Sequence, residues 1–428
     1  MKLPLLILIL ALFIQKNHLA TVTRSDQVLN VRPRTDAHVD VIKNITSMSE
    51  VILWKPDSSD HIVKNNEVHF YVNVSAVDEV KTQLDKSGFT YTVLVEDAQS
   101  LIEQQTFNDS VGQRSSVSYY EQYHSLDDIY YWMEQMAEKN PDMVEKFNIG
   151  FSFENRPLQV LKLSGKKGME EEAKGTKIAI WIDCGIHARE WISPAFCMWF
   201  VGHAVGFYGT DKTMTKLLKY IDFYVLPVMN VDGYHYTWTT NRMWRKNRSK
   251  YQNSTCTGTD LNRNFDAGWC GPGASSNPCH DIYCGPFPES EAEVKAVVNF
   301  IKNNLDVLKG YISIHSYSQM VLFPYSYTKK KTKDHEELQQ LANRVTDGMR
   351  ATYRNKYAYG TGAETIYLAP GGSDDWAYDI GIKYSFTFEL RDKGTYGFLL
   401  PMSLIKPTCS EALTGIKIIA GHIVKQIN

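Results

Sequence analysis

After residue 125 the chain alternates short apolar runs with helical patterns, and this alternation constrains its fold more than any other feature. The apolar runs predict buried strands, at 178–184, 223–233, 311–318 and 383–392. Helical patterns alternate with these strands, at 193–209, 290–304 and 410–427. Such an arrangement predicts an α/β domain whose sheet is covered by helices on both faces.

Two of the predicted helices carry start signals. Ser193 is expected to be the N-cap of the first helix, with Pro194 in its first turn. Ser290 and Glu293 have the spacing of a capping box, which predicts the start of the helix at 290–304.

A smaller domain is predicted ahead of the α/β domain, in residues 21–95. Strand and helix patterns alternate there, and a further helix begins at residue 98, so we expect a small α+β domain followed by a connecting helix. The segment 107–125 is rich in Asn, Ser and Gly and contains one basic residue, Arg114. This composition predicts an exposed linker, a preferred place for proteolysis.

The first 20 residues have the pattern of a secretory signal peptide. A lysine precedes an apolar run that is too short for a membrane span, and small residues follow near Ala20. No later segment is apolar enough to cross a bilayer, so we expect an exported protein without a membrane span. The net charge of -2 argues against a general nucleic-acid binder.

In a secreted chain, the seven cysteines are expected to form disulfides. Cys184 and Cys197 lie thirteen residues apart, and four more cysteines lie between residues 256 and 284, which leaves Cys409 as the odd one. Sequons for N-glycosylation occur at Asn44, Asn73, Asn108, Asn247 and Asn253. Those at Asn44, Asn73 and Asn108 predict a glycosylated N-terminal region.

A metal site is indicated where the first apolar strand of the large domain ends. His187 and Glu190 follow this strand and offer the nitrogen and oxygen ligands of zinc; the alternative is a bonded histidine with a Glu190–Arg189 ion pair. His315 lies at the end of another apolar strand, so it can converge on the same point. A ring nitrogen that does not bind zinc needs an acceptor, for which Asp260 is the candidate.

Polar residues with catalytic chemistry lie in other strands and loops. Glu389, in an apolar strand, is either the partner of Arg391 or a general base beside a metal-bound water. If their loops border the zinc, Arg245 could stabilise an oxyanion, and Asn262 with Arg263 could bind a carboxylate.

Six motifs together resemble the secreted zinc carboxypeptidases of the A/B type. They are "GIHAREW", "NRMWRKNRS", "DLNRNF", "ISIHSYSQ", "TIYLAPGGSDDWAYD" and "FTFELRDKGTYGFLLP". The resemblance covers 115–428 as catalytic domain, with a mixed α/β sheet, and 21–114 as activation segment. The stretches "VILWKP" and "SYYEQYHSL" are similar to those of plasma members, which implies an extracellular location in plasma and a role in limiting fibrinolysis.

The resemblance also implies roles for residues at matching positions. One Zn²⁺ per chain would be held by His187, Glu190 and His315, with Glu389 as the base and Arg245 as the oxyanion-stabilising residue. Asn262, Arg263 and Tyr367 would anchor the free carboxylate of the substrate, and Arg189 would help along the groove. Asp374 would lie at the floor of the specificity pocket, which implies removal of C-terminal Lys or Arg from peptides.

Further implications concern cross-links, activation and modification. The implied disulfides are Cys184–Cys197, Cys256–Cys279 and Cys270–Cys284, with Cys409 free. A trypsin-like protease is expected to cleave after Arg114. A glycan on Asn247 would crowd the site, so that sequon is expected to be unused. Asp375 is expected to cap the turn that follows it rather than to line the pocket. The alternatives are an A-type enzyme for apolar C-termini and a catalytically inactive binding homologue.

Overall fold

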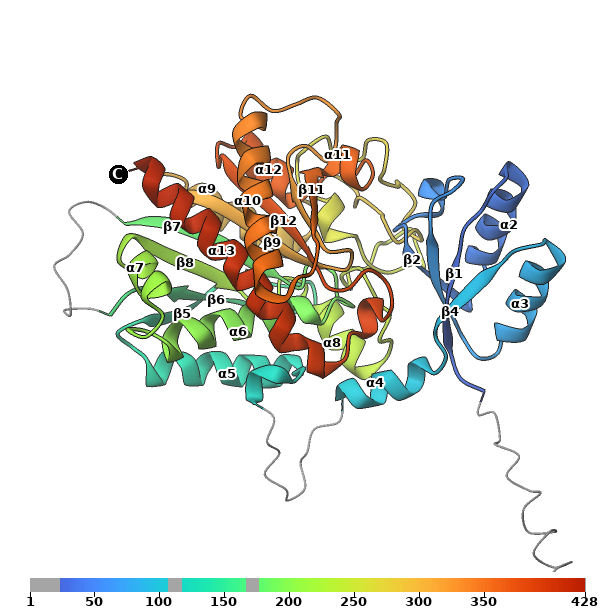
Figure 1. Cartoon of the computed structure of the whole chain (residues 1–428), viewed down its shortest axis with the longest axis horizontal. Helices are drawn as coiled ribbons and strands as arrows, with labels where there is room; N and C mark the ends of the chain where they lie inside the picture. Colours follow the sequence, from blue (N-terminus) through green and yellow to red (C-terminus); the bar gives the residue numbers. More distant parts are fainter. Residues whose placement is uncertain (1–23, 107–117, 167–176, 428) are drawn as a thin grey trace, which may run out of the picture.

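The computed structural model describes residues 24–106, 118–166 and 177–427, which form two domains (Figure 1). We call residues 24–106 the small domain and residues 118–427 the large domain. The predicted signal peptide at 1–20, Asn108 and the cleavage site at Arg114 lie outside the described residues.

The small domain is a four-stranded antiparallel sheet in the order β2-β3-β1-β4 with two helices on one face. Its elements are β1 (Gln27–Val31), α2 (Asp36–Thr46), β2 (Val51–Lys55), β3 (Val68–Val72), α3 (Val77–Lys86), β4 (Tyr91–Val95) and α4 (Ala98–Thr106). Alternate strand residues, such as Leu29 and Phe70, pack against Ile42 of α2 and Val80 of α3. The predicted α+β domain is therefore confirmed, with β1 as a strand that the pattern did not single out.

The other face of this small sheet packs on the large domain. Val28, Trp54 and Tyr71 contribute to a shared apolar cluster that contains Tyr317 and Phe398 of the large domain. The Trp54 and Phe398 rings meet edge to face, with their centroids 5.1 Å apart. The small domain therefore buries one sheet face in its own core and docks the opposite face.

The large domain is built on an eight-stranded mixed sheet in the order β11-β10-β12-β9-β7-β8-β6-β5. The strands are β5 (Val144–Phe151), β6 (Pro157–Leu163), β7 (Ile178–Cys184), β8 (Ile221–Leu226), β9 (Leu308–Ser316), β10 (Met320–Phe323), β11 (Ala358–Thr361) and β12 (Tyr384–Leu390). The central strands β12, β9, β7 and β8 are parallel, whereas β10, β6 and β5 join the sheet by antiparallel pairing.

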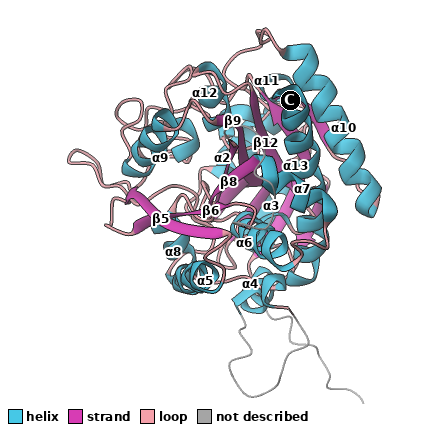
Figure 2. Ribbon diagram, turned by 90° about the vertical axis from the view of Figure 1, so that its left-hand side faces the viewer, coloured by secondary structure: helices cyan, strands magenta, loops and turns pink. Residues whose placement is uncertain are grey.

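Helices cover both faces of this sheet, as predicted (Figure 2). One core contains residues of α5 (Leu126–Lys139), α6 (Ile192–Gly206), α7 (Lys212–Tyr220), α10 (His335–Tyr353) and α13 (Ile405–Ile427). A second core, which includes Trp181, Val297 and Trp376, packs α9 (Ala292–Asn303) and α12 (Ser373–Asp379) on the sheet. Two short helices, α8 (Val231–Thr239) and α11 (Gly362–Thr365), lie in the connections.

Both helices form within two residues of their predicted starts, but both predicted N-caps are wrong. Helix α6 begins at Ile192, and Ser193 lies inside it, where its hydroxyl accepts from the Gly185 N–H and donates to the Ile314 carbonyl at 2.5 Å. The Ser290 hydroxyl accepts from the Asn264 side-chain amide at 2.9 Å and donates to the adjacent Glu291 carboxylate at 2.7 Å, and α9 begins without a side-chain cap. In both cases a tertiary contact takes the side chain that the local pattern assigned to the cap.

Three disulfides cross-link the large domain, in the pairs Cys184–Cys197, Cys256–Cys279 and Cys270–Cys284. Cys409 is a buried free thiol in α13. The first disulfide joins the end of β7 to α6, and the other two hold the long irregular connection between α8 and α9.

Candidate active site

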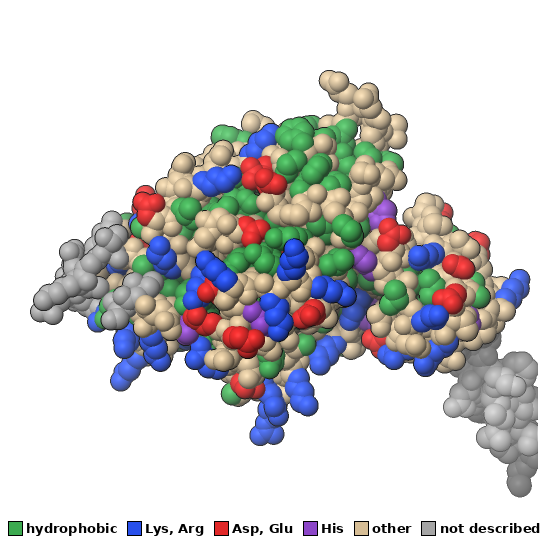
Figure 3. Space-filling view, turned by 90° about the horizontal axis from the view of Figure 1, so that it is seen from above, with side chains coloured by type: hydrophobic (Ala, Val, Ile, Leu, Met, Phe, Trp, Pro, Cys, Tyr) green, Lys and Arg blue, Asp and Glu red, His purple; other side chains and the backbone are tan. Residues whose placement is uncertain are grey.

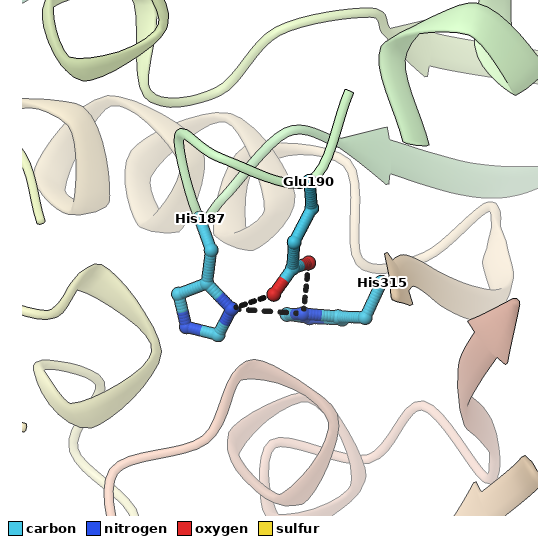
Figure 4. A group of neighbouring side chains, drawn as sticks. All are labelled: His187, Glu190 and His315. Carbon is cyan, nitrogen blue, oxygen red and sulfur yellow. Dashed lines mark hydrogen bonds and ion pairs between the residues drawn. The ribbon is translucent and has the colours of Figure 1, made fainter. Parts of the chain in front are cut away.

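His187, Glu190 and His315 converge at the ends of β7 and β9 (Figure 4). These strands are parallel neighbours, with Cys184 opposite Ile314, so their carboxyl ends deliver side chains to one point. The Glu190 carboxylate lies 2.7 Å from His187 Nδ1 and 3.2 Å from His315 Nδ1. All three side chains are buried, and no Glu190–Arg189 ion pair exists among the described residues, so that alternative is wrong.

The outer ring nitrogens of both histidines have partners that fix their orientation. His187 Nε2 lies 3.1 Å from Asp260 Oδ1, and His315 Nε2 lies 3.1 Å from Ser313 Oγ. Because the Ser313 hydroxyl donates to Asp183 at 2.6 Å, its oxygen is left to accept from His315. With a metal at Nδ1, both histidines would donate from Nε2 to these partners, and the two Nδ1 atoms with the Glu190 carboxylate form a donor set that fits a catalytic zinc.

Asp183 and Ser313 are functional candidates that the sequence analysis missed. Ser313 lies two residues before His315 in β9 and therefore on the same face of the sheet. The two-residue spacing between Ser313 and His315 is the sequence signal that could have identified Ser313 as a partner of the histidine. Asp183 lies in an apolar strand and is fully buried, where burial raises the pKa of its carboxyl, while bonds from Ser313 and Trp181 act against that rise.

Glu389 lies beside this group, in β12. It is directly opposite His315 in the parallel β12–β9 pair and lines the same cavity. Burial raises the pKa of Glu389 to about 8, although the charge of His315 opposes the rise. The alternative partner, Arg391, instead donates to Glu411 of α13 at 2.8 and 2.5 Å, so a Glu389–Arg391 ion pair is excluded.

Asp260 connects the histidine cluster to an arginine pair. One of its oxygens faces His187, and the other accepts from Arg245 at 3.1 and 2.8 Å. Burial alone would raise the pKa of Asp260, but Arg245 and His187 hold it well below the ordinary value. Asp260 therefore stays ionised and fixes Arg245 close to the histidines.

The small domain supplies a carboxylate to these arginines. Asp57 accepts from Arg263 at 2.5 Å and lies 4.0 Å from Arg245. Its other oxygen is 2.9 Å from His61 Nδ1, and the His61 ring stacks on Tyr367 with centroids 4.6 Å apart. Burial would raise the pKa of Asp57, but the bond to His61 and the arginine charges lower it. The sequence analysis missed both residues, because their role depends on docking between domains.

Asp374 and Asp375 face different surroundings. Asp374 lines the cavity, is 3% exposed, and has one carboxylate oxygen, Oδ2, without a hydrogen-bond partner in the described structure. Burial raises the pKa of Asp374. Asp375 accepts from the backbone N–H groups of Ser326 and Tyr327 at 2.7 and 2.9 Å, so it braces a distant loop and does not cap the next turn as expected.

The loop before Asp374 packs closely on the arginine loop. Gly371 has a φ of +77°, and a Cβ there would lie 2.2 Å from the Arg263 carbonyl oxygen, so only glycine fits. The Asn262 side-chain oxygen accepts from the Ser373 N–H at 3.0 Å. These contacts hold the Asp374 loop against the residues that bind Asp57.

Unlike the other residues predicted to bind substrate, Arg189 does not line the cavity. It is fully buried, and its guanidinium lies 4.4 Å from the centre of the Phe398 ring. It also donates to the Leu53 carbonyl of the small domain at 3.4 Å. In this structure Arg189 therefore contacts the docked small domain.

The remaining predicted residues share one cavity of about 670 Å³ at the border of the two domains. His187, Glu190, His315, Glu389, Arg245, Asn262, Arg263, Tyr367 and Asp374 line it from the large domain. Trp54, Lys55, Asp57 and His61 close it from the small domain. Figure 3 shows histidine side chains where the two domains meet. A buried donor set, a base and paired arginines in one cavity suit hydrolysis of a substrate that carries a carboxylate.

Two family models match the chain. The zinc carboxypeptidase model matches residues 129–415, and the carboxypeptidase activation peptide model matches residues 29–105. The second match falls within the small domain.

Curated relatives and a solved structure extend this likeness over most of the chain. Carboxypeptidase B2 of Bos taurus is 57% identical over 403 residues, 94% of each chain. Carboxypeptidase B2 of Homo sapiens is 57% identical over 406 residues, 94% of this chain and 95% of that protein. The crystal structure of thrombin activatable fibrinolysis inhibitor is 56% identical, with a TM-score of 0.89 over 94% of this chain and 99% of that chain.

These matches agree with the fold and with the donor set of the cavity. Among residues 24–106, 118–166 and 177–427, no helix is long and apolar enough to cross a membrane. The protein uses one zinc ion per chain, acts on peptides and is activated by proteolysis. The chain therefore belongs to the zinc carboxypeptidases and carries the activation peptide of that family in its small domain.

Proposed function

We propose that this chain is a secreted zymogen whose active form removes C-terminal Lys or Arg from peptides and proteins. The observation that carries the proposal is the Asp374 carboxylate, which is buried at the cavity wall with an unpartnered oxygen. A buried carboxylate is costly unless a cation meets it. The side chain of a C-terminal Lys or Arg supplies that cation, whereas an apolar side chain leaves the carboxylate unpaired.

The other cavity residues divide the remaining work. Arg263, Asn262 and Tyr367 hold the terminal carboxylate of the substrate, a role supported by the way Arg263 binds Asp57. Arg245 stabilises the negative charge that develops on the scissile carbonyl oxygen. Glu389 takes a proton from the attacking water and passes it to the leaving amine. When bound by His187, Glu190 and His315, zinc polarises the carbonyl and lowers the pKa of water.

The docked small domain accounts for zymogen behaviour. Asp57 occupies the arginines that the substrate carboxylate needs, and His61 covers Tyr367. We propose that a trypsin-like protease cleaves after Arg114, so that residues 21–114 can leave and the cavity opens. The solved structure of thrombin activatable fibrinolysis inhibitor supports a role in limiting fibrinolysis in plasma.

Two substrates that differ only in the C-terminal residue test the proposal. Precursor cleaved by trypsin should begin at Ser115 and should hydrolyse a peptide ending in Arg at least ~10²-fold faster than one ending in Phe. This ratio corresponds to the lower part of the ~3–5 kcal/mol cost of a broken buried pair. A chelator should abolish both activities. Faster hydrolysis of the Phe peptide would establish A-type specificity, and no hydrolysis of either would indicate an inactive homologue.

Variants of the two adjacent aspartates test which of them determines the preference for a basic C-terminal residue. Asp374→Ala should erase most of the preference for Arg over Phe, mainly by slowing the Arg peptide. Asp375→Asn is the matched control, because Asp375 does not line the cavity and its carboxylate accepts from the backbone N–H groups of Ser326 and Tyr327. Loss of the preference in Asp375→Asn but not in Asp374→Ala would show that the wrong carboxylate is assigned.

A further inference from the structure

A second cavity, of about 530 Å³, lies between the two domains and is separate from the active site. Ser49, Glu50, Ile52, Tyr71, Asn73, Gln99 and Ile102 line it from the small domain, and residues 237–243 line it from the large domain. In Figure 1, α4 and α8 lie at this border. Its volume is within the ~300–1,000 Å³ of ordinary small-molecule sites.

One lining residue, Asn73, is the asparagine of a sequon. Its side-chain oxygen accepts from the N–H and hydroxyl of Ser75, the third sequon residue, at 3.1 and 2.7 Å. Its backbone N–H donates to the Glu50 carbonyl at 2.8 Å, which fixes Asn73 beside the cavity wall. The position of Asn73 therefore places a glycan attachment point directly at an interdomain cavity.

The other sequons in the described residues lack this placement. Asn44 and Asn253 are exposed and line neither of the two cavities described here. Asn247 is fully buried, and its amide nitrogen donates to Glu291 at 2.8 Å and to Ser249 at 2.9 Å, which leaves no room for a glycan. Asn73 alone among these four combines partial exposure with a cavity shared by both domains.

The lining of the cavity has the chemistry that sugars require. Trp238 is half-buried and lines the cavity. One face of its ring stacks on Trp191, with the ring centroids 4.2 Å apart. Hydroxyl and amide side chains also line the cavity, from Ser49, Gln99, Thr239, Thr240 and Asn241. Aromatic surface with a few polar groups is the usual composition of a ligand site, and a pyranose ring offers matching apolar faces and hydroxyls.

We propose that the first N-acetylglucosamine residues of an N-linked glycan on Asn73 occupy this cavity and connect the small domain to the large domain. Attachment forms a bond from Asn73 Nδ2 to C1 of the sugar of a lipid-linked oligosaccharide diphosphate. The C1–O bond to the diphosphate breaks, and the amide loses one proton. Because the glycan is tethered to the small domain, its contact with residues 237–243 is intramolecular and stabilises docking at high effective concentration.

The test compares full-length precursors secreted from a glycosylating eukaryotic cell. Mass spectrometry of the peptides determines whether Asn73 is occupied. Hydrogen exchange of the uncut precursor then measures the protection of the backbone at 237–243. We expect Asn73→Gln and Ser75→Ala to increase exchange there by roughly tenfold, and Ser75→Thr, which keeps the sequon, to leave exchange unchanged. Asn44→Gln removes a glycan site on α2 and is the matched control.

Two results would overturn the proposal. One is an unmodified Asn73 in both the natural chain and the Ser75→Thr variant. The other is an occupied Asn73 with the same protection of 237–243 in Asn73→Gln as in the natural chain. If the variants fail to fold, removal of the whole glycan from the folded natural precursor by an amidase that cleaves the bond between Asn73 and the sugar, leaving Asp, gives the same comparison. None of these readouts requires peptidase activity, so a failure here is distinct from a failure of the proposed function.

Discussion

The two ends of the active-site cavity are held by different parts of the chain. At the metal end, His187, Glu190 and His315 are fixed by partners from the large domain, Asp260 and Ser313. At the arginine end, Arg263 finds its anionic partner in Asp57 of the small domain. The metal end is therefore complete before activation, whereas the arginine end exchanges one carboxylate for another when substrate replaces the small domain. Inactivity of the precursor then comes from occupancy and not from misplaced catalytic groups.

The largest expected effect belongs to the metal end after activation. Glu389→Gln keeps the size of the side chain but removes the base. Turnover by the cleaved enzyme should fall by ~10²–10⁴-fold, the range of general-base contributions. Zinc content measured on the same sample should not change, because Glu389 is outside the ligand set. Turnover close to that of the natural enzyme would exclude Glu389 as the base.

Asp57→Ala tests whether occupancy of the arginine end by the small domain keeps the precursor inactive. In the docked precursor this variant leaves the buried Arg263 without its carboxylate, a loss of ~3–5 kcal/mol. Undocking solvates Arg263 again, so hydrolysis of a small substrate by the uncut precursor should rise by about 10²-fold or more. After cleavage, the variant and the natural chain should have equal rates. An unchanged uncut rate would mean that Asp57 does not control access.

Ser313→Ala tests whether the metal end is independent of the small domain. Loss of the bond to His315 Nε2 should weaken zinc binding by ~10–100-fold, as for other residues that orient a ligand. The zinc dissociation constant, measured by competition with a chelator, should change equally in the uncut and cleaved forms. Ser316→Ala is the matched control, because the Ser316 hydroxyl is buried in the same strand without a hydrogen-bond partner in the described structure. Weaker zinc binding in only one of the two forms would show that the metal end depends on docking of the small domain.

The smallest expected effect is a pH dependence of the stability of the docked small domain, which we assign to His69. This buried histidine lies 2.9 Å from the Tyr317 hydroxyl and 3.8 Å from Glu67, and burial together with Lys55 lowers its pKa to about 4. The pKa of His69 in the folded chain lies below its unfolded value of 6.5. The free energy of unfolding that depends on neutral His69 is therefore fully present above pH 6.5 and is lost as the pH falls towards 4.

Urea unfolding of the intact precursor measures this effect. Between pH 7 and pH 5, the free energy of unfolding of the small domain should fall by about 2 kcal/mol more in the natural chain than in His69→Gln. Asp57 does not account for the difference, because it loses its contribution only at lower pH. Equal pH dependence in both chains would show that His69 is not the titrating group.

Most of the large-domain core could be predicted from the sequence because apolar runs report burial directly. The strands that hold His187, His315 and Glu389 were predicted in this way. The capping roles of Ser193 and Ser290 were predicted wrongly, since a hydroxyl that suits a local cap also suits a distant carbonyl or side-chain amide. Only the packed structure decides between them.

The parts of the site that depend on long-range pairing could not be predicted. Arg391 was weighed as a partner of Glu389, but Glu411, twenty residues further on in α13, takes it. Asp57 and His61 have no local signal, because a polar turn on a small domain resembles any solvated loop until the domains dock. The roles implied by the resemblance at Asn262, Arg263, Tyr367 and Asp374 concern one cavity, which is lined by segments far apart in the sequence.

The two disulfides around the arginine loop link the formation of the site to the redox state of the surroundings. Cys256–Cys279 and Cys270–Cys284 close overlapping loops of 23 and 14 residues, and this segment has little regular secondary structure. Each such cross-link typically contributes ~2–4 kcal/mol by restricting the unfolded chain. Under reducing conditions the loop that carries Asn262 and Arg263 would lose both of these cross-links. Recognition of the substrate carboxylate is therefore acquired only where thiols oxidise, along the secretory route.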